Sequence, residues 1–178
     1  MKLLFATLTM SFSLSAHAAD FTLSSTQIAP GAAIPAAQYA NAFGCTGNSV
    51  MPDLQWRNAP AGTKSFAVTF YDQDAPTGSG FWHWVAYDIP ATTQSLPGGV
   101  NAGPLPAGTI EGNTDVGQPG FFGPCPPAGR LHHYTYTVHA LKVDKLPVGK
   151  GATAALVGFF LWQHSLGKAS FTVTAGPR

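Results

Sequence analysis

The strongest β-forming run in this chain reads Ser65-Phe66-Ala67-Val68-Thr69-Phe70-Tyr71. Aromatic and β-branched residues are enriched in strands because their side chains pack well on a pleated surface. The run stops at a polar segment that begins with Asp72 and contains Pro76 and Gly78. We therefore expect a strand over residues 65–71 with a polar turn at its end.

Further strands are expected on both sides of this run. Residues 82–89 and 133–141 are the longest of them, and both are rich in aromatic and β-branched residues. Within 133–141, alternation places Tyr134 and Tyr136 on the face opposite His133. Shorter strands are expected at residues 21–23, 54–56 and 170–174.

A helix is expected over residues 153–166, with Thr153 as its N-cap and Gly167 as its C-terminal stop. Residues 92–127 contain many glycines and prolines and few apolar runs, so we expect a long loop there. Across the chain, 20 glycines and 15 prolines divide the sequence into short segments. The pattern predicts a mainly β fold, a sandwich or a barrel, with one or two short helices.

The N-terminus has the pattern of a secretory signal peptide. Lys2 is followed by an apolar run that is too short to span a bilayer, and then by Ala16-His17-Ala18. Small residues at the first and third places of that triplet suit signal peptidase. We expect residues 1–18 to be removed and residues 19–178 to form a single domain in the periplasm or outside the cell. No later run is long and apolar enough for stable membrane insertion.

The charge balance restricts the classes of partner. The chain has 9 basic and 8 acidic residues, and removal of Lys2 leaves eight of each. A nucleic-acid partner is not expected, because binding the phosphate backbone needs a basic face. Charged residues make up 10% of the chain, against about a quarter in a typical protein. The few charged side chains are therefore informative.

The chain contains two cysteines, Cys45 and Cys125. In an exported protein two cysteines can pair, and closing a loop of about 80 residues would stabilise the fold by about 4 kcal/mol. The alternative is a pair of separate buried thiols. Export favours a disulfide between them.

Two polar segments have ordinary structural interpretations when each is taken alone. Asp72 and Asp74 follow a strand, and their side chains could cap backbone N–H groups in a turn. In an extended stretch these two residues would share a face. His83 lies between Trp82 and Trp84, which favours a buried structural histidine.

A third segment, residues 123–134, contains three prolines and two glycines and leads into His132 and His133. Proline stiffens a loop and glycine permits tight turns, so the segment could hold a small ligand rigidly. Because side chains alternate across a strand, only one of the two histidines can enter a given pocket.

Together the three segments resemble the phosphatidylethanolamine-binding protein family, and within it the bacterial Raf-kinase-inhibitor-like members. The matching signatures are Asp72-x-Asp74-Ala75-Pro76, Trp82-His83-Trp84 and Gly123-Pro124-Cys125-Pro126-Pro127-x-Gly129-x-x-His132-x-Tyr134. The resemblance extends over residues 21–173. It implies a β-sandwich with a large central sheet and peripheral helices.

The resemblance also implies a small anion pocket at one end of the sheet, able to take phosphate, acetate or a phospholipid headgroup. Carried over by position, the ligand-binding residues are Asp72, His83, His132 and the backbone of Cys125, Pro126 and Pro127, with Asp74, Gly123 and Tyr134 close by. The chain departs from the family where Gln73 replaces a proline and where Met51 replaces a serine.

A carboxylate beside a histidine holds its tautomer and raises its pKa, which suits anion binding. The resemblance implies a non-enzymatic binding protein without a cofactor. Alternatives remain open: a metal-dependent hydrolase that uses the Asp/His cluster, or a protein-binding module whose surface is the loop over residues 92–120. Self-association into a homodimer also stays open. A serine hydrolase is not expected, since Gly-x-Ser-x-Gly is missing from the sequence.

Several other residues are interpreted as structural. Trp56, Trp84 and Trp162 are expected to pack in the core or on a sheet face. The lysines are interpreted as ordinary surface charges: Lys64, Lys142, Lys145 and Lys150.

The export interpretation predicts the mature N-terminus. When the full chain is expressed in a bacterial host, we expect cleavage after Ala18, because Ala16 and Ala18 provide the small side chains that signal peptidase requires. Intact-mass measurement of the protein from the periplasm or medium should find a chain that begins at Ala19. Recovery of an uncleaved chain from the cytoplasm would contradict this.

Overall fold

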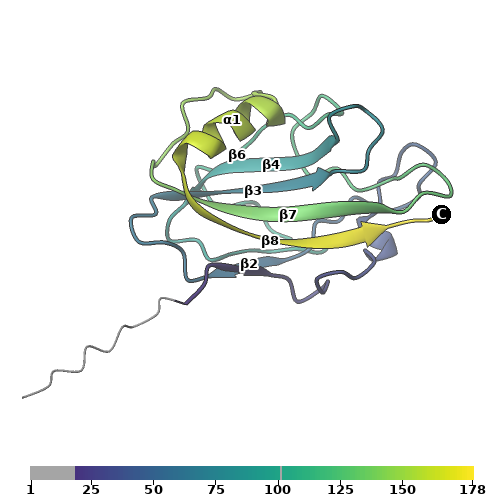
Figure 1. Cartoon of the computed structure of the whole chain (residues 1–178), viewed down its shortest axis with the longest axis horizontal. Coiled ribbons are helices and arrows are strands. Elements are labelled where there is room, and N and C mark those ends of the chain that lie inside the picture. The colour runs from purple at the N-terminus through teal and green to yellow at the C-terminus, as the bar shows by residue number, and fades with distance from the viewer. Residues whose placement is uncertain (1–18, 101) are drawn as a thin grey trace, which may run out of the picture.

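The computed structural model describes residues 19–100 and 102–178 (Figure 1). The expected signal peptide, residues 1–18, lies outside the described residues. Two antiparallel sheets and a helix make up the fold. None of the helices in the described ranges is long and apolar enough to cross a membrane.

The larger sheet has five strands in the order β6-β4-β3-β7-β8. Their bounds are β3 Ser65–Asp72, β4 Phe81–Pro90, β6 Ile110–Glu111, β7 His132–Leu141 and β8 Ser165–Ala175. β3 is the central strand, and all of its residues except Tyr71 are buried. Burial on both faces explains why its sequence is a nearly continuous apolar run.

The smaller sheet has the order β1-β2-β5, with bounds β1 Thr22–Ser24, β2 Leu54–Arg57 and β5 Ser95–Leu96. It packs against one face of the larger sheet. Leu54 and Trp56 of β2 share a buried cluster with Phe66, Val68 and Phe70, which are alternate residues of β3. This arrangement confirms the predicted sandwich.

The helix α1, Ala154–His164, covers the other face of the larger sheet (Figure 1). Its residues Val157 and Leu161 pack against Ala67, Val85 and Leu141 of the sheet. A second, one-turn 3-10 helix, η1, spans Ala36–Gln38.

The predicted start of the helix is confirmed and the predicted end is wrong. The Thr153 hydroxyl accepts a hydrogen bond from the Leu156 amide at 3.3 Å, as an N-cap does. At the other end the chain passes directly from His164 into β8, so Gly167 lies within a strand. Pairing of Ser165 with Leu141 of β7 ends the helix in place of a glycine cap.

Other expectations are corrected in detail. The last strand begins at Ser165 because β8 pairs with β7 along its whole length. Trp56 and Trp84 are buried, but Trp162 is exposed, so its interpretation as a packing residue is wrong. Helical periodicity is the reason: Val157 and Leu161 face the sheet, and Trp162 is turned about 100° from Leu161.

Cys45 and Cys125 form a disulfide, which agrees with the pairing favoured by export. Their Cα atoms are 5.9 Å apart and 80 positions separate them in the sequence. The bond joins the loop that follows η1 to the proline-rich loop before β7.

Loss of this disulfide should destabilise the fold. Replacing both cysteines by serine (C45S with C125S) frees the unfolded chain from an 80-residue loop, which should lower the free energy of unfolding by about 4 kcal/mol. Urea denaturation of the oxidised protein, the reduced protein and the double variant measures this. Reductant should leave the double variant unchanged, and equal stability of all three forms would show that the bond contributes little.

Candidate functional site

Three strand ends bring the candidate residues together. β3 ends at Asp72, and antiparallel pairing sets Asp72 opposite Phe81 of β4 and Tyr134 of β7. His83 lies two residues into β4, and His132 is the first residue of β7. Residues that are distant in the sequence therefore meet at one end of the sheet.

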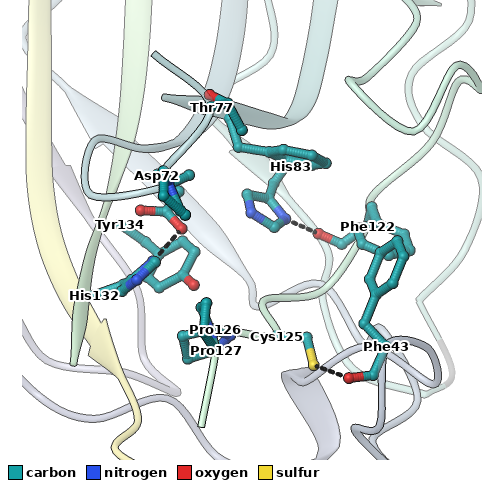
Figure 2. Close-up of a pocket in the computed structure, with 13 residues that line it drawn as sticks. Phe43, Asp72, Thr77, His83, Phe122, Cys125, Pro126, Pro127, His132 and Tyr134 are labelled. Carbon is teal, nitrogen blue, oxygen red and sulfur yellow. Dashed lines mark hydrogen bonds and ion pairs between the residues drawn. The ribbon is translucent and has the colours of Figure 1, made fainter. Parts of the chain in front are cut away.

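A cavity of about 170 Å³ lies at this end (Figure 2). Asp72, His83 and His132 line it, and Figure 2 shows both imidazoles facing the same space. The remaining lining residues are Phe43, Ala75, Pro76, Thr77, Phe81, Phe122, Cys125, Pro126, Pro127 and Tyr134. Most of the wall is thus apolar, with a small polar centre.

Asp72 and His132 form a buried pair. His132 donates its Nδ1 proton to Asp72 Oδ2 across 2.8 Å, and both residues are almost fully buried. The other carboxylate oxygen accepts a hydrogen bond from the Asp74 amide at 2.9 Å. Because Nδ1 is used by the carboxylate, Nε2 is the ring nitrogen that remains for a ligand.

His83 is fixed by backbone contacts. Its Nδ1 lies 2.9 Å from the Phe122 carbonyl oxygen, which can only accept, so Nδ1 carries the proton. The Phe122 amide in turn donates to the His83 carbonyl at 3.0 Å. Burial lowers the pKa of His83 to about 4, and the hydrogen bond to Phe122 and the charge of Asp72 only partly oppose this. At neutral pH the ring is uncharged and Nε2 is an acceptor.

Tyr134 supplies an unused donor. Its hydroxyl is buried and has no hydrogen-bond partner in the described part of the chain. Burial, followed by the nearby charge of Asp72, raises its pKa far above 10, so the hydroxyl stays protonated. A buried hydroxyl without a partner costs free energy that a ligand could recover.

The proline-rich loop is held by contacts with distant segments. At Gly123 a Cβ atom would overlap the backbone of Gln38 and Ala40, so a larger residue cannot fit there. The Gly123 amide donates to Ser49 Oγ at 3.1 Å. Gly123 therefore fixes the position of the wall and does not itself line the cavity.

Arg178, at the end of the sequence, also supports the wall. Its Nε donates to the Pro126 carbonyl at 2.7 Å, and Nη2 donates to the Phe43 carbonyl at 3.1 Å. No pattern in the sequence indicated Arg178, Phe43 or Phe122 as site residues. Phe43 lies outside the three matching signatures, and an apolar side chain in a loop carries no chemical signal of its own.

Asp74 and His133 form a second pair, outside the cavity. Asp74 Oδ2 accepts from the His133 amide and from His133 Nδ1, each at 2.7 Å. These hydrogen bonds lower the pKa of Asp74. The chain bends after β3, so Asp74 does not share the pocket face with Asp72, contrary to the expectation from an extended stretch. Its amide supports Asp72 from behind.

The geometry does not resemble a metal site. Among residues 19–100 and 102–178, no group of three or more histidines, cysteines, aspartates or glutamates is placed to hold a metal ion. Each aspartate of the segment is paired with a different histidine, one inside the pocket and one outside it.

Known proteins share this sequence pattern. The profile of the family described as phosphatidylethanolamine-binding protein matches residues 24–176. YbcL of Escherichia coli is 44% identical over 179 residues, which cover 97% of each chain. YbhB of the same organism is 45% identical over 152 residues, covering 84% of this chain and 96% of the relative. LppC of Mycobacterium tuberculosis, described as a putative lipoprotein, is 35% identical over 158 residues, covering 88% of this chain and 73% of the relative.

Solved structures share the fold. The crystal structure of E. coli YbcL, described as a new member of the mammalian PEBP family, has a TM-score of 0.85 and 42% identity. That match covers 90% of this chain and 100% of the other. A putative homologue from Chlamydia trachomatis has a TM-score of 0.72 at 24% identity, covering 86% and 95% of the two chains, and shows the fold alone. The resemblance drawn from the sequence is thereby confirmed: the chain belongs to the phosphatidylethanolamine-binding protein family.

Proposed function

We propose that this protein binds a small anion of the phosphate type, such as phosphate or a phospholipid headgroup, without catalysing a reaction. The observation that carries the proposal is the pairing of each pocket histidine through Nδ1, to Asp72 for His132 and to Phe122 for His83. Both imidazoles are held in place, which leaves the two Nε2 atoms and the Tyr134 hydroxyl for a ligand.

The charges of the pocket determine which protonation state of the ligand binds. Asp72 brings a negative charge, His83 is neutral because of its lowered pKa, and neither lysine nor arginine lines the cavity. The negative charge of Asp72 would repel a phosphate dianion, and the unprotonated Nε2 of His83 offers it no donor. The anion must bind with a proton, which is carried by the ligand or taken up by an imidazole.

The size of the cavity suits a small ligand or a headgroup. At about 170 Å³ it is comparable to the cavity of about 150 Å³ that admits benzene in another protein. A phosphate group with a short substituent fits such a space, and the acyl chains of a phospholipid would have to stay outside.

The proposed location is the cell envelope, as a periplasmic or secreted protein. The N-terminal pattern of residues 1–18 supports export, and so does the description of the related LppC as a putative lipoprotein. A protein partner that responds to the occupied pocket is part of the proposal. Residues 92–100 and 102–120, which contain the short strands β5 and β6 where we expected one long loop, are the surface proposed for it.

Affinity for the anion should fall as pH rises. Free His83 has a pKa of about 4, so a proton that it carries in the complex is taken up from solvent above this value. A proton carried by the anion is taken up only above the anion's own second pKa, about 6 for a phosphomonoester. When binding takes up one proton, the affinity falls by up to tenfold for each pH unit above the pKa that the protonated group has in the complex. Calorimetric titration with phosphate and phosphoethanolamine should give at least about tenfold weaker binding at about pH 8 than at about pH 5.5. Binding enthalpies that depend on the ionisation heat of the buffer would show the proton, whereas equal affinity at both pH values would refute the proposal.

His132→Ala should abolish phosphate binding, because it removes one Nε2 and leaves the Asp72 charge unpaired in the pocket. His133→Ala is a matched control, since it breaks a histidine–aspartate pair of nearly equal length outside the cavity. Calorimetry at about pH 5.5 should detect binding by the control and none by His132→Ala, with thermal unfolding confirming that both variants fold. Equal loss in the two variants would mean that the pocket is not the site.

A further inference from the structure

The outward face of α1 is apolar and uncovered. Leu156, Phe159 and Trp162 are 47%, 52% and 79% exposed, and Leu166, just after the helix, is 41% exposed. α1 contains no aspartate, glutamate, lysine or arginine. A helix on the surface of a globular protein normally turns a polar face outward, so the apolar outer face of α1 calls for a partner.

A groove extends this apolar surface. A cavity of about 380 Å³ lies between α1 and the outer face of the larger sheet. Trp82 of β4 and Trp162 are among the residues that line it, and Lys168 of β8 lies in the same wall. The exposed face of α1 and the groove therefore form one surface, which we call the α1 face: Trp82, Leu156, Phe159, Leu161, Trp162, Leu166 and Lys168.

Lys168 lies in the α1 face, and three further lysines lie in segments next to it. Lys168 lines the groove, and the Lys142 amide donates to the His164 carbonyl at the end of α1. Lys150 lies in the turn that precedes α1. Lys64 follows the turn that contains Gly62. This turn lies close to Leu166, since a Cβ atom added to Gly62 would be 3.9 Å from Leu166 Cδ1.

These positive charges are not neutralised by neighbouring carboxylates. In the described part of the chain, both ion pairs are formed by histidines and none by a lysine. Asp144 is the acidic residue nearest in the sequence to Lys142 and Lys150. Near the groove, the Asp115 carboxylate accepts from the Trp82 amide at 2.8 Å, and the buried Asp88 carboxylate accepts from the Leu146 amide at 2.8 Å. The α1 face is thus an apolar surface with a basic border.

We propose that the α1 face docks the protein on an anionic phospholipid surface. Leu156, Phe159 and Trp162 enter the boundary between headgroups and acyl chains, and the lysines contact the lipid phosphates. Apolar area and electrostatic attraction act together in such binding, and each lysine near an anionic membrane contributes about a fivefold increase in affinity. An α1 of eleven residues is about 16 Å long, so it lies in the plane of the membrane and does not cross it.

The charges favour a membrane over a second copy of the chain. A two-fold dimer through α1 would place the same patch of each protomer against the other. The unpaired lysines of both copies would then face each other and repel, whereas anionic lipids attract them.

Docking is separate from the anion pocket. The two sites lie on opposite faces of the larger sheet: Trp82 lines the groove, whereas its neighbours Phe81 and His83 line the pocket, because side chains alternate along a strand. α1 itself lies over the end of the sheet away from the C-terminus, and Arg178 at that terminus holds the pocket wall (Figure 1). The pocket thus stays accessible when the α1 face is against a membrane. The proposal goes beyond the proposed function and does not depend on it.

Vesicle co-sedimentation tests the proposal. The protein is the exported chain with its start at Ala19 verified by mass, because residues 3–15 are apolar and could bind lipid themselves. We expect binding to vesicles of phosphatidylethanolamine with about one quarter phosphatidylglycerol, and much weaker binding to phosphatidylcholine. Raising the salt from about 0.05 M to about 0.5 M should weaken binding to the anionic vesicles.

Variants locate the contact. Trp162→Ala should weaken partitioning at least about tenfold, because a large apolar side chain no longer enters the lipid, and Trp162→Phe should retain most of it. Leu156→Ala should weaken binding, and Leu131→Ala is its matched control, since Leu131 is equally exposed at 48% but distant from α1. Lys142→Ala combined with Lys168→Ala should reduce binding by about 25-fold. All of these residues are at least partly exposed, so thermal unfolding should change little.

His132→Ala should leave vesicle binding intact, which separates this proposal from the pocket. The membrane proposal would be overturned if the protein did not bind anionic vesicles at low salt, or if wild type and Trp162→Ala bound them equally. It would also be overturned if sedimentation showed a dimer that Trp162→Ala dissociates and the protein did not bind vesicles.

Discussion

The antiparallel pairing of β3 with β4 on one side and β7 on the other is the constraint on which the rest of the structure depends. A strand buried on both faces must satisfy its backbone N–H and C=O groups within the sheet. Two neighbours do this along β3, and their register sets the end of β3 beside the start of β4 and the start of β7. The pocket is a consequence of that register, since Asp72, His83 and His132 occupy these three ends.

The two histidine–aspartate pairs consist of the same chemical groups but differ in their exposure to solvent. Asp72–His132 and Asp74–His133 have nearly equal lengths, 2.8 Å and 2.7 Å. The first is buried in an apolar wall and its charge acts through a low dielectric, while the second is screened by water. Burial also lowers the pKa of His83, so at neutral pH this imidazole is uncharged and adds no positive charge to the pocket. The proposed anion binding would therefore be linked to proton uptake.

The larger sheet carries both proposed sites, the polar pocket at its strand ends and the apolar α1 face on one side. Its strand ends form a small, preorganised pocket closed by the proline-rich loop, the disulfide and Arg178. One of its faces is covered by α1, whose outer side presents apolar side chains and a border of lysines. A protein of the cell envelope with both features could sample headgroup-like ligands at a membrane while its pocket remains open to solvent.

Several strands, the start of the helix and the family were determined by the sequence itself. Three features are local patterns: the β run over residues 65–71, the alternation of Tyr134 and Tyr136 with His133, and the Thr153 cap. Each depends only on residues close in the sequence, because the periods of strands and helices repeat over a few residues. Three ordered signatures were sufficient for the family. The family resemblance had already implied that Asp72 lines the pocket and that Asp74 lies beside it. The tertiary structure decided that Arg178 supports the pocket wall, that Trp162 is exposed and that pairing with β7 ends α1. Each of these depends on contacts between segments far apart in the chain, and a side chain's neighbours in space are not encoded in its neighbours in sequence.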